Sequence, residues 1–394
     1  MPEPASRPRF AIAAKGFRPF FLLAACFAAS IVPVWIAILA GLVPPSTTLD
    51  PTTWHAHEMV FGFAVAVIAG FLLTAASNWT QRETVVGAPL LALSALWLAG
   101  RAAMVLPGVL PRGMSAVIDL AFLPALIAVL ARPLVASKNR RNFVMLGVLG
   151  ALFVANLVVH LDALQVTSLG SGRRACLVAI DVVLLVILVI AGRVFPMFTR
   201  NATGIASIRS SRPLDALAIG GMGVLSLLDA FMPESLGAGV AAAVVAALAL
   251  LRTGPWGMRH TARHPLLWIL HLGHGWIPIG LALRAFSTLT QAIPGSFATH
   301  ALTLGAIGSL TLGMMARVSL GHTGRLLVAS KPIVAAFIAI TLAAGARAIV
   351  PLFVPSLYLV TLYAAAALWT GAFVLFLYVY APILTSPRPD GKPG

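Results

Sequence analysis

Long apolar segments recur along the whole sequence and restrict its fold more than any other feature. Each is about 20 residues long and almost free of charge, the length a helix needs to cross a hydrocarbon layer. Only 10% of the 394 residues are charged, whereas soluble domains carry roughly 25%. We therefore expect an all-α polytopic membrane protein, a single transmembrane domain embedded in the lipid bilayer, with no sizeable soluble part.

The apolar segments divide into twelve predicted transmembrane helices. Polar, Arg- or Pro-bearing turns separate them, and a helix cannot continue easily through such turns. The predicted spans are 19–43, 54–77, 88–107, 113–131, 142–164, 173–194, 214–232, 236–252, 264–285, 297–318, 332–350 and 357–383. The Pro- and Arg-bearing segment before the first span predicts no cleavable signal peptide.

The net charge of +16 would suit a nucleic-acid partner, but its distribution has another cause. Nearly all Lys and Arg residues fall in the connections on one side of the predicted spans. Three exceptions lie in connections on the other side: Arg112, Arg173 and Arg174. Three more lie within spans: Arg101, Arg284 and Arg347. This asymmetry is the positive-inside pattern of membrane proteins. It predicts that both the N- and the C-terminus are cytoplasmic, and that no nucleic acid is bound.

Two recurring signatures suggest an internal repeat. Arginines open the first, fifth and ninth spans at nearly equal spacing: Arg18, Arg141 and Arg263. Threonines follow the second, sixth and tenth spans in the same way: Thr80, Thr199 and Thr323. We therefore consider three pseudo-repeats of four helices, about 15–131, 138–256 and 260–386. Chance recurrence among many cytoplasmic arginines is the alternative.

Histidines within or beside the apolar segments are the main candidates for function. Four lie at the predicted outer face: His55, His57, His160 and His300. Two lie near mid-depth of the ninth span: His271 and His274. Asp119, Asp181 and the three arginines within spans join them in the outer half. Ionisable groups at membrane depth are costly and usually face a pocket or a partner. Together they predict a buried polar chamber.

The chemistry of these residues favours a metal cofactor. Neutral imidazole binds haem iron and copper, and an arginine within a span can neutralise a haem propionate. His55 and His57 are two residues apart, about 200° around a helix. In a helix they would point to opposite sides, whereas in an extended turn they could share one metal. Asp119 and Asp181 could instead pair with Arg101 or Arg347 for purely structural reasons.

Four longer motifs occur in order along the chain. They are KGFRPFFLLAA from Lys15, WHAHEMVFGF from Trp54, GRVFPMFTRN from Gly192 and RVSLGHTGR from Arg317. In these motifs the sequence resembles the NnrS family of haem- and copper-containing bacterial membrane proteins. The resemblance implies b-type haem and copper in the bacterial inner (cytoplasmic) membrane. It also implies nitric oxide as a ligand and a role in nitrosative stress and denitrification, without identifying the metal ligands or the electron donor.

A more distant similarity is to the main subunit of haem-copper oxidases. That subunit has twelve helices in three pseudo-symmetric arcs, with haem ligands at the outer ends of its second and tenth helices. Here His55 or His57 lies at the outer end of the second predicted span, and His300 lies at the outer end of the tenth. The oxidase copper site takes histidines from helices 6 and 7, and the predicted spans 6 and 7 contain none. Oxidase-type reduction of oxygen or nitric oxide is therefore not expected, and whether the protein is an enzyme stays open.

These arguments lead to one set of site predictions and two alternatives. We predict His57 and His300 as axial haem ligands, with His55 as the alternative to His57, and Arg284 and Arg101 near the propionates. For copper, the candidates are His271 and His274 together with His160. The first alternative is a secondary transporter without redox cofactor, centred on His271, His274 and Asp181. The second is a non-catalytic protein that holds or hands over metal.

Overall fold

The computed structural model describes residues 11–45, 49–106, 108 and 110–392, and over these residues it is helical without strands. Twelve helical segments are long and apolar enough to span a membrane, which confirms the predicted all-α architecture. Six of them are single helices in the first two thirds of the chain: α1 (Phe17–Leu39), α4 (Ala88–Val105), α7 (Val144–Ala163), α8 (Ser171–Thr203), α9 (Arg212–Phe231) and α10 (Leu236–Leu251). Three more follow: α11 (Pro265–Thr290), α14 (Lys331–Ala348), which continues into α15 (Val350–Phe353), and α16 (Tyr358–Thr385).

The other three spans are each divided into shorter segments. The second consists of α2 (Pro51–His57), the π-helix η2 (Glu58–Ala64) and α3 (Val65–Thr80). The fourth consists of α5 (Arg112–Leu120) and α6 (Phe122–Ala136). The tenth consists of α12 (Gly295–His300), the π-helix η6 (Ala301–Gly308) and α13 (Ser309–His322). A π-helix is rare and is often found at functional sites, and here each one begins directly after a histidine.

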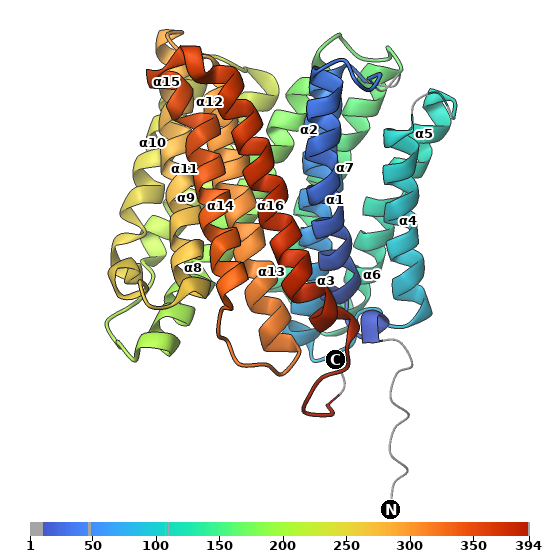
Figure 1. Ribbon diagram of the computed structural model, residues 1–394, viewed down its shortest axis with the longest axis vertical. Helices are drawn as coiled ribbons and strands as arrows, with labels where there is room; N and C mark the ends of the chain where they lie inside the picture. Colours follow the sequence, from blue (N-terminus) through green and yellow to red (C-terminus); the bar gives the residue numbers. More distant parts are fainter. Residues whose placement is uncertain (1–10, 46–48, 107, 109, 393–394) are drawn as a thin grey trace, which may run out of the picture.

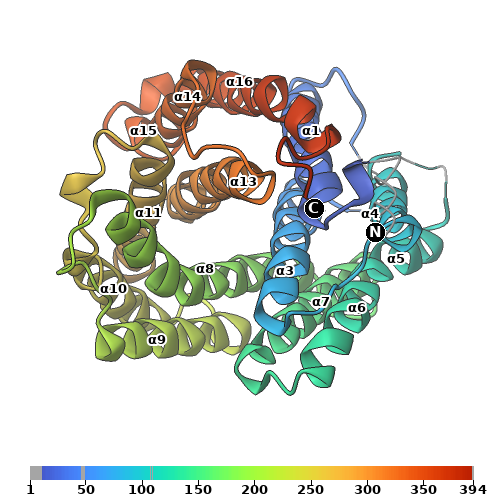
Figure 2. The ribbon, with the colours of Figure 1, turned by 90° about the horizontal axis from the view of Figure 1, so that it is seen from below.

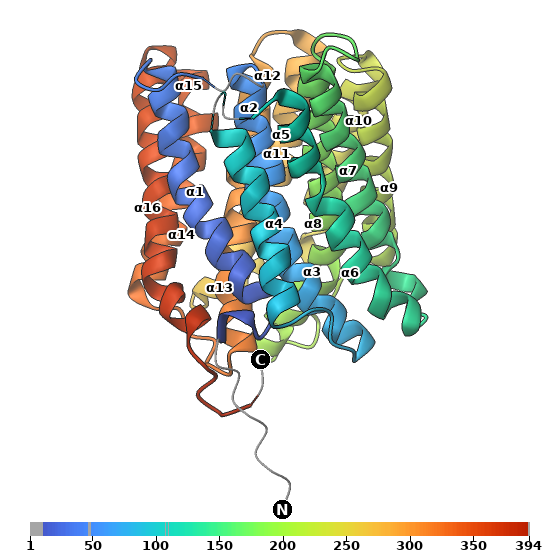
Figure 3. The same cartoon turned by 90° about the vertical axis from the view of Figure 1, so that its right-hand side faces the viewer.

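The spans run side by side along the long axis of the molecule (Figure 1). Viewed along that axis, α13 lies inside the bundle, surrounded by α8, α11, α14 and α16 (Figure 2). The side view shows α1, α3 and α4 toward the viewer, with α1 beside α16 (Figure 3). The start of α1 and the end of α16 lie at the same end (Figure 1). This agrees with an even number of spans, while the cytoplasmic location of that end stays a prediction.

The sixth span is longer than predicted. The sequence predicts that it ends at residue 194, but α8 continues through Pro196 to Thr203. Proline removes one helix hydrogen bond, and it is tolerated here because the residues around it pack against neighbouring helices. The helix ends where Gly204 adopts a positive φ of 72°, a conformation that glycine reaches without steric cost.

An arginine near the start of α1 binds carbonyl groups at the end of α16. Arg18 is fully buried, and its Nη1 donates hydrogen bonds of 2.8 Å to the carbonyl oxygens of Leu384 and Ser386. These carbonyls lie at the end of α16, where the helix leaves them without partners of its own. Arg18 therefore ties the first and the last span together.

Glycines bring α11 close to the tenth span. A Cβ atom on Gly280 would lie 3.1 Å from the backbone nitrogen of Leu302, and one on Gly273 would lie 3.2 Å from that of Leu310. Both distances are shorter than ordinary contacts, so the two backbones approach only because the side chains are absent. This contact fixes η6 and α13 against α11 just below His300.

Candidate cofactor site

A cavity of about 680 Å³ lies between α2, α8, α11 and the α12–η6 segment, and α14 and α16 contribute to its wall. Ligand pockets commonly have volumes of about 300–1,000 Å³. The exposed residues Glu234 and Gln291 also line the cavity. It therefore reaches the end of the bundle that carries the loops after α9 and α11, the upper end in Figure 1.

His55 and His300 line this cavity together. His300 Nδ1 lies 2.7 Å from the carbonyl oxygen of Ser296. A carbonyl only accepts, so Nδ1 carries the proton and Nε2 keeps its lone pair. The ring of His55 stacks on Trp35 at 4.6 Å with an interplanar angle of 9°, and its Nδ1 is buried without a hydrogen-bond partner.

Arginines from three helices also line the cavity. Arg284 on α11 pairs with Asp181 and Asp229. Arg347 on α14 stacks on Tyr358 and donates to its hydroxyl at 3.3 Å, but its Nη1 is buried without a partner. Two more arginines lie at the start of α8: Arg173 and Arg174. A cavity with this much positive charge suits a ligand that carries carboxylates.

His57 belongs to a separate, buried network. Its Nε2 lies 3.2 Å from Asp119 Oδ2 and 2.9 Å from Asn156 Oδ1, and its Nδ1 lies 2.8 Å from Glu58 Oε1. His160 Nε2 contacts the same Asp119 oxygen at 2.9 Å. Ligand atoms of His57, Asp119 and His160 all lie within 4.8 Å of one another and could hold a metal ion.

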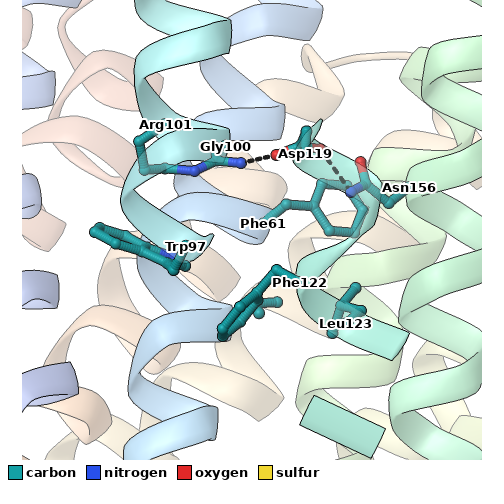
Figure 4. Close-up of a pocket in the computed structure, with 9 residues that line it drawn as sticks. Phe61, Trp97, Gly100, Arg101, Asp119, Phe122, Leu123 and Asn156 are labelled. Atoms are coloured by element: carbon teal, nitrogen blue, oxygen red, sulfur yellow. Dashed lines mark hydrogen bonds and ion pairs between the residues drawn. The ribbon is translucent and has the colours of Figure 1, made fainter. Parts of the chain in front are cut away.

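Arg101 completes this network. Its guanidinium bridges two carboxylates, donating to Glu58 Oε1 at 2.7 Å and to Asp119 Oδ1. Figure 4 shows Arg101 and Asp119 pointing toward each other, with Asn156 reaching Asp119 from α7. The cavity beside them is about 10 Å³, room for one water molecule at most. Both nitrogens of His57 and both oxygens of Asp119 have partners, whereas Glu58 Oε2, Arg101 Nε and His160 Nδ1 are buried without one.

His271 and His274 lie on one face of α11 in a third environment. His271 Nε2 is 3.0 Å from Thr199 Oγ1. His274 is completely buried, and neither of its ring nitrogens has a hydrogen-bond partner. Its ring meets Trp256 edge-on at 4.7 Å, and Phe195 also contacts both histidines. An unsatisfied buried polar side chain costs about 1–3 kcal/mol, so His274 is a candidate metal ligand.

The structure brings some of the predicted residues together and separates others. His55, His300 and Arg284 share the cavity, whereas His57 and Arg101 are not among its lining residues. His160 lies with His57 near the end of α7. His271 lies near the start of α11, about 28 Å of helix rise from its last residue, Thr290. The structure therefore does not bring His160, at the end of α7, to His271 and His274. Asp119 pairs with Arg101 as considered, but Asp181 pairs with Arg284 rather than Arg347.

Some residues of the cavity have no clear sequence signal. Asp229 lies near the end of α9 and reaches the cavity only because α9 packs on α8. Trp35 is one of several tryptophans in apolar segments, and only the fold places it on His55. Arg347 did carry a signal, since it is an arginine within a span, but its partners depend on how the last two spans pack.

These features define a class: a multi-pass membrane protein with a histidine- and arginine-lined cavity at one end. The chain belongs to the NnrS family, since the family model described as NnrS protein matches residues 11–388. Membership indicates a membrane protein of the nitric oxide response, in a family known for metal binding. A comparison with curated proteins finds no match.

Proposed function

We propose that this protein binds a b-type haem between His55 and His300, and acts in the bacterial inner membrane in the response to nitric oxide and nitrosative stress. Nitric oxide is the proposed ligand. The observation that carries the proposal is the presence of two imidazoles in one arginine-lined cavity of about 680 Å³. His55 thus replaces His57 as the preferred partner of His300, because His57 already makes hydrogen bonds elsewhere.

The residues of the cavity fit a haem. His300 offers Nε2 because Ser296 holds its Nδ1 proton, the arrangement usual for a metal-binding histidine. Trp35 fixes the ring plane of His55. Arg347 Nη1, buried without a partner, is available to a propionate, and Arg284 lies in the same wall. When bound, haem would supply iron that coordinates nitric oxide and exchanges one electron.

Apolar side chains also line the cavity, among them Val60, Phe63 and Ile307. They lower the local dielectric constant, which strengthens the contacts made by the arginines. The electron donor and the reaction, if any, are not specified by these residues.

For copper, we propose His271 and His274. Both are neutral donors on one helix face, and His274 has two ring nitrogens without partners. The rings of Phe195 and Trp256 lie against His274, and aromatic surroundings suit Cu(I) better than a hard cation. The polar groups nearby are the Thr199 hydroxyl at His271 and the Arg252 guanidinium, which stacks on Trp256. The compact set of His57, Asp119 and His160 is the second candidate. Its disadvantage is that Arg101 and Asn156 already occupy the oxygens of Asp119.

The test is an optical spectrum of the purified protein combined with iron and copper analysis. We expect His55→Ala and His300→Ala each to lose the haem absorbance, and His57→Gln to keep it. His260→Ala, at an exposed residue, is the matched control. If His55→Ala and His300→Ala both retain the wild-type spectrum, the axial assignment is wrong.

The same preparations test copper and the transporter alternative. His271→Ala and His274→Ala should lose copper and keep haem, whereas loss of copper only in His57→Gln or His160→Ala would move the site to that network. A colourless protein without iron or copper that takes up a solute in liposomes would instead indicate a secondary transporter.

A further inference from the structure

Two carboxyl groups meet one guanidinium in the cavity wall. Asp181 on α8 is completely buried, and Asp229 on α9 is 3% exposed. Arg284 Nη1 donates to Asp181 Oδ1 at 2.9 Å, and its Nη2 pairs with Asp229 Oδ2. Because both carboxyl groups contact the same guanidinium, they lie close to each other. All three residues line the cavity.

The charges of this group do not balance. Two ionised carboxylates and one guanidinium leave one negative charge, and burying an unpaired charge is very costly. Asp181 Oδ2 is buried without a hydrogen-bond partner. Two ionised carboxylates cannot hydrogen-bond to each other, because neither has a hydrogen to donate. One proton between them satisfies the free oxygen and neutralises the group, as in other carboxyl pairs at close range.

No other described group supplies the missing positive charge. The remaining charged or titratable residues of the cavity wall are Arg173, Arg174, Cys176, Glu234, Arg347, His55 and His300. None of the ion pairs described for this chain joins them to Asp181 or Asp229. The helix α10, which packs on α9, and the segment η6, which packs on α8, carry no ionisable residue.

We propose that Asp181 and Asp229 form a proton-binding site that holds one proton and exchanges it with water through the cavity. The site lies in the same wall as the proposed haem position. In this state one of the two carboxyl groups is still ionised. An electron that a one-electron donor delivers to a group in the cavity would therefore favour uptake of a second proton from water by the remaining carboxylate. This second part rests on the proposed function, whereas the proton site itself does not.

Infrared spectroscopy of the purified protein tests the site directly. We expect the C=O stretching band of a protonated carboxyl group near neutral pH, shifted in D₂O. Asp181→Asn and Asp229→Asn should each remove it, because the single remaining carboxylate pairs with Arg284 and ionises. Asp215→Asn is the matched control, since Asp215 is the one carboxylate paired with Arg252, and it should leave the band unchanged.

Two infrared outcomes would overturn the proposal. One is a band of wild-type intensity in both Asn variants. The other is a band that appears only after sodium is removed, since a metal cation would then occupy the site. If the variants do not fold, titration of the wild-type band with pH decides the question: a carboxyl band absent at neutral pH overturns the site.

A redox titration tests the coupling. A tenfold change in proton concentration corresponds to about 59 mV for a one-electron couple, so the haem potential of the wild type should rise by up to that amount per pH unit of acidification. Both Asn variants should give a flatter slope, and equal slopes would overturn the coupling. A preparation without haem would contradict the proposed function, and the infrared result would still decide the proton site.

Discussion

At the residue scale, neighbouring histidines have different roles because α2 is helical. His55 and His57 are separated by about 200° around the helix axis, so one lines the cavity and the other enters the network with Asp119. The nitrogens of His57 are both hydrogen-bonded, whereas those of His274 are not. This contrast in hydrogen bonding, rather than the presence of histidine, distinguishes a structural role from a candidate ligand.

Arg101 should be essential for stability rather than for haem binding. Replacing it by Gln leaves the carboxylates of Glu58 and Asp119 buried without their cation. Breaking a buried ion pair in this way costs about 3–5 kcal/mol. We expect Arg101→Gln to lower the unfolding free energy by that amount in a denaturant titration in detergent. Arg82→Gln, at an exposed arginine, should change it by about 0.5 kcal/mol or less; equal effects would contradict the network's role.

At the element scale, the position of His300 depends on how the tenth span packs. The π-helix η6 starts at the next residue, and a π-turn changes the rotation of the helix above it relative to the helix below it. The contacts of Gly273 and Gly280 then hold this span against α11. The second span has the same order of elements, with η2 directly after His57.

Glycine substitutions on α11 test this packing within one helix. We expect Gly273→Ala and Gly280→Ala to destabilise the protein by about 1–3 kcal/mol, because the new methyl group has no room beside Leu310 or Leu302. A Cβ atom on Gly275 meets no other atom within 4 Å, so Gly275→Ala should be neutral or stabilising by up to about 1 kcal/mol. Thermal unfolding in detergent measures all three, and equal losses would show that close approach is unimportant.

At the scale of the whole molecule, the two ends of the bundle differ in chemistry. The cavity opens at the end that carries Arg173, Arg174 and Glu234, while most other cationic residues lie in connections at the opposite end. The positive-inside rule predicts that the cavity end faces away from the cytoplasm. A ligand that arrives from outside would then enter the cavity without crossing the apolar half of the bundle.

Reporter fusions test this orientation. A green fluorescent protein fused after the last residue should fluoresce, because it folds in the cytoplasm. Alkaline phosphatase, which is active only outside the cytoplasm, should be active after Gln165, in the loop between α7 and α8, and inactive after Ser137, in the loop between α6 and α7. The reverse pattern of activity would place the cavity end in the cytoplasm.

The sequence by itself determined the membrane class and the number of spans, because apolar length and charge asymmetry are local properties. It also identified His55, His300 and Arg284 as candidates, since ionisable residues in apolar segments are visible one at a time. Only the tertiary structure decided which of them meet. Three features depend on helix rotation and on contacts between distant segments: the π-turns, the pairing of Asp181 with Arg284 and the position of Asp229. Helix rotation and long-range contacts cannot be read from the spacing of residues within one span.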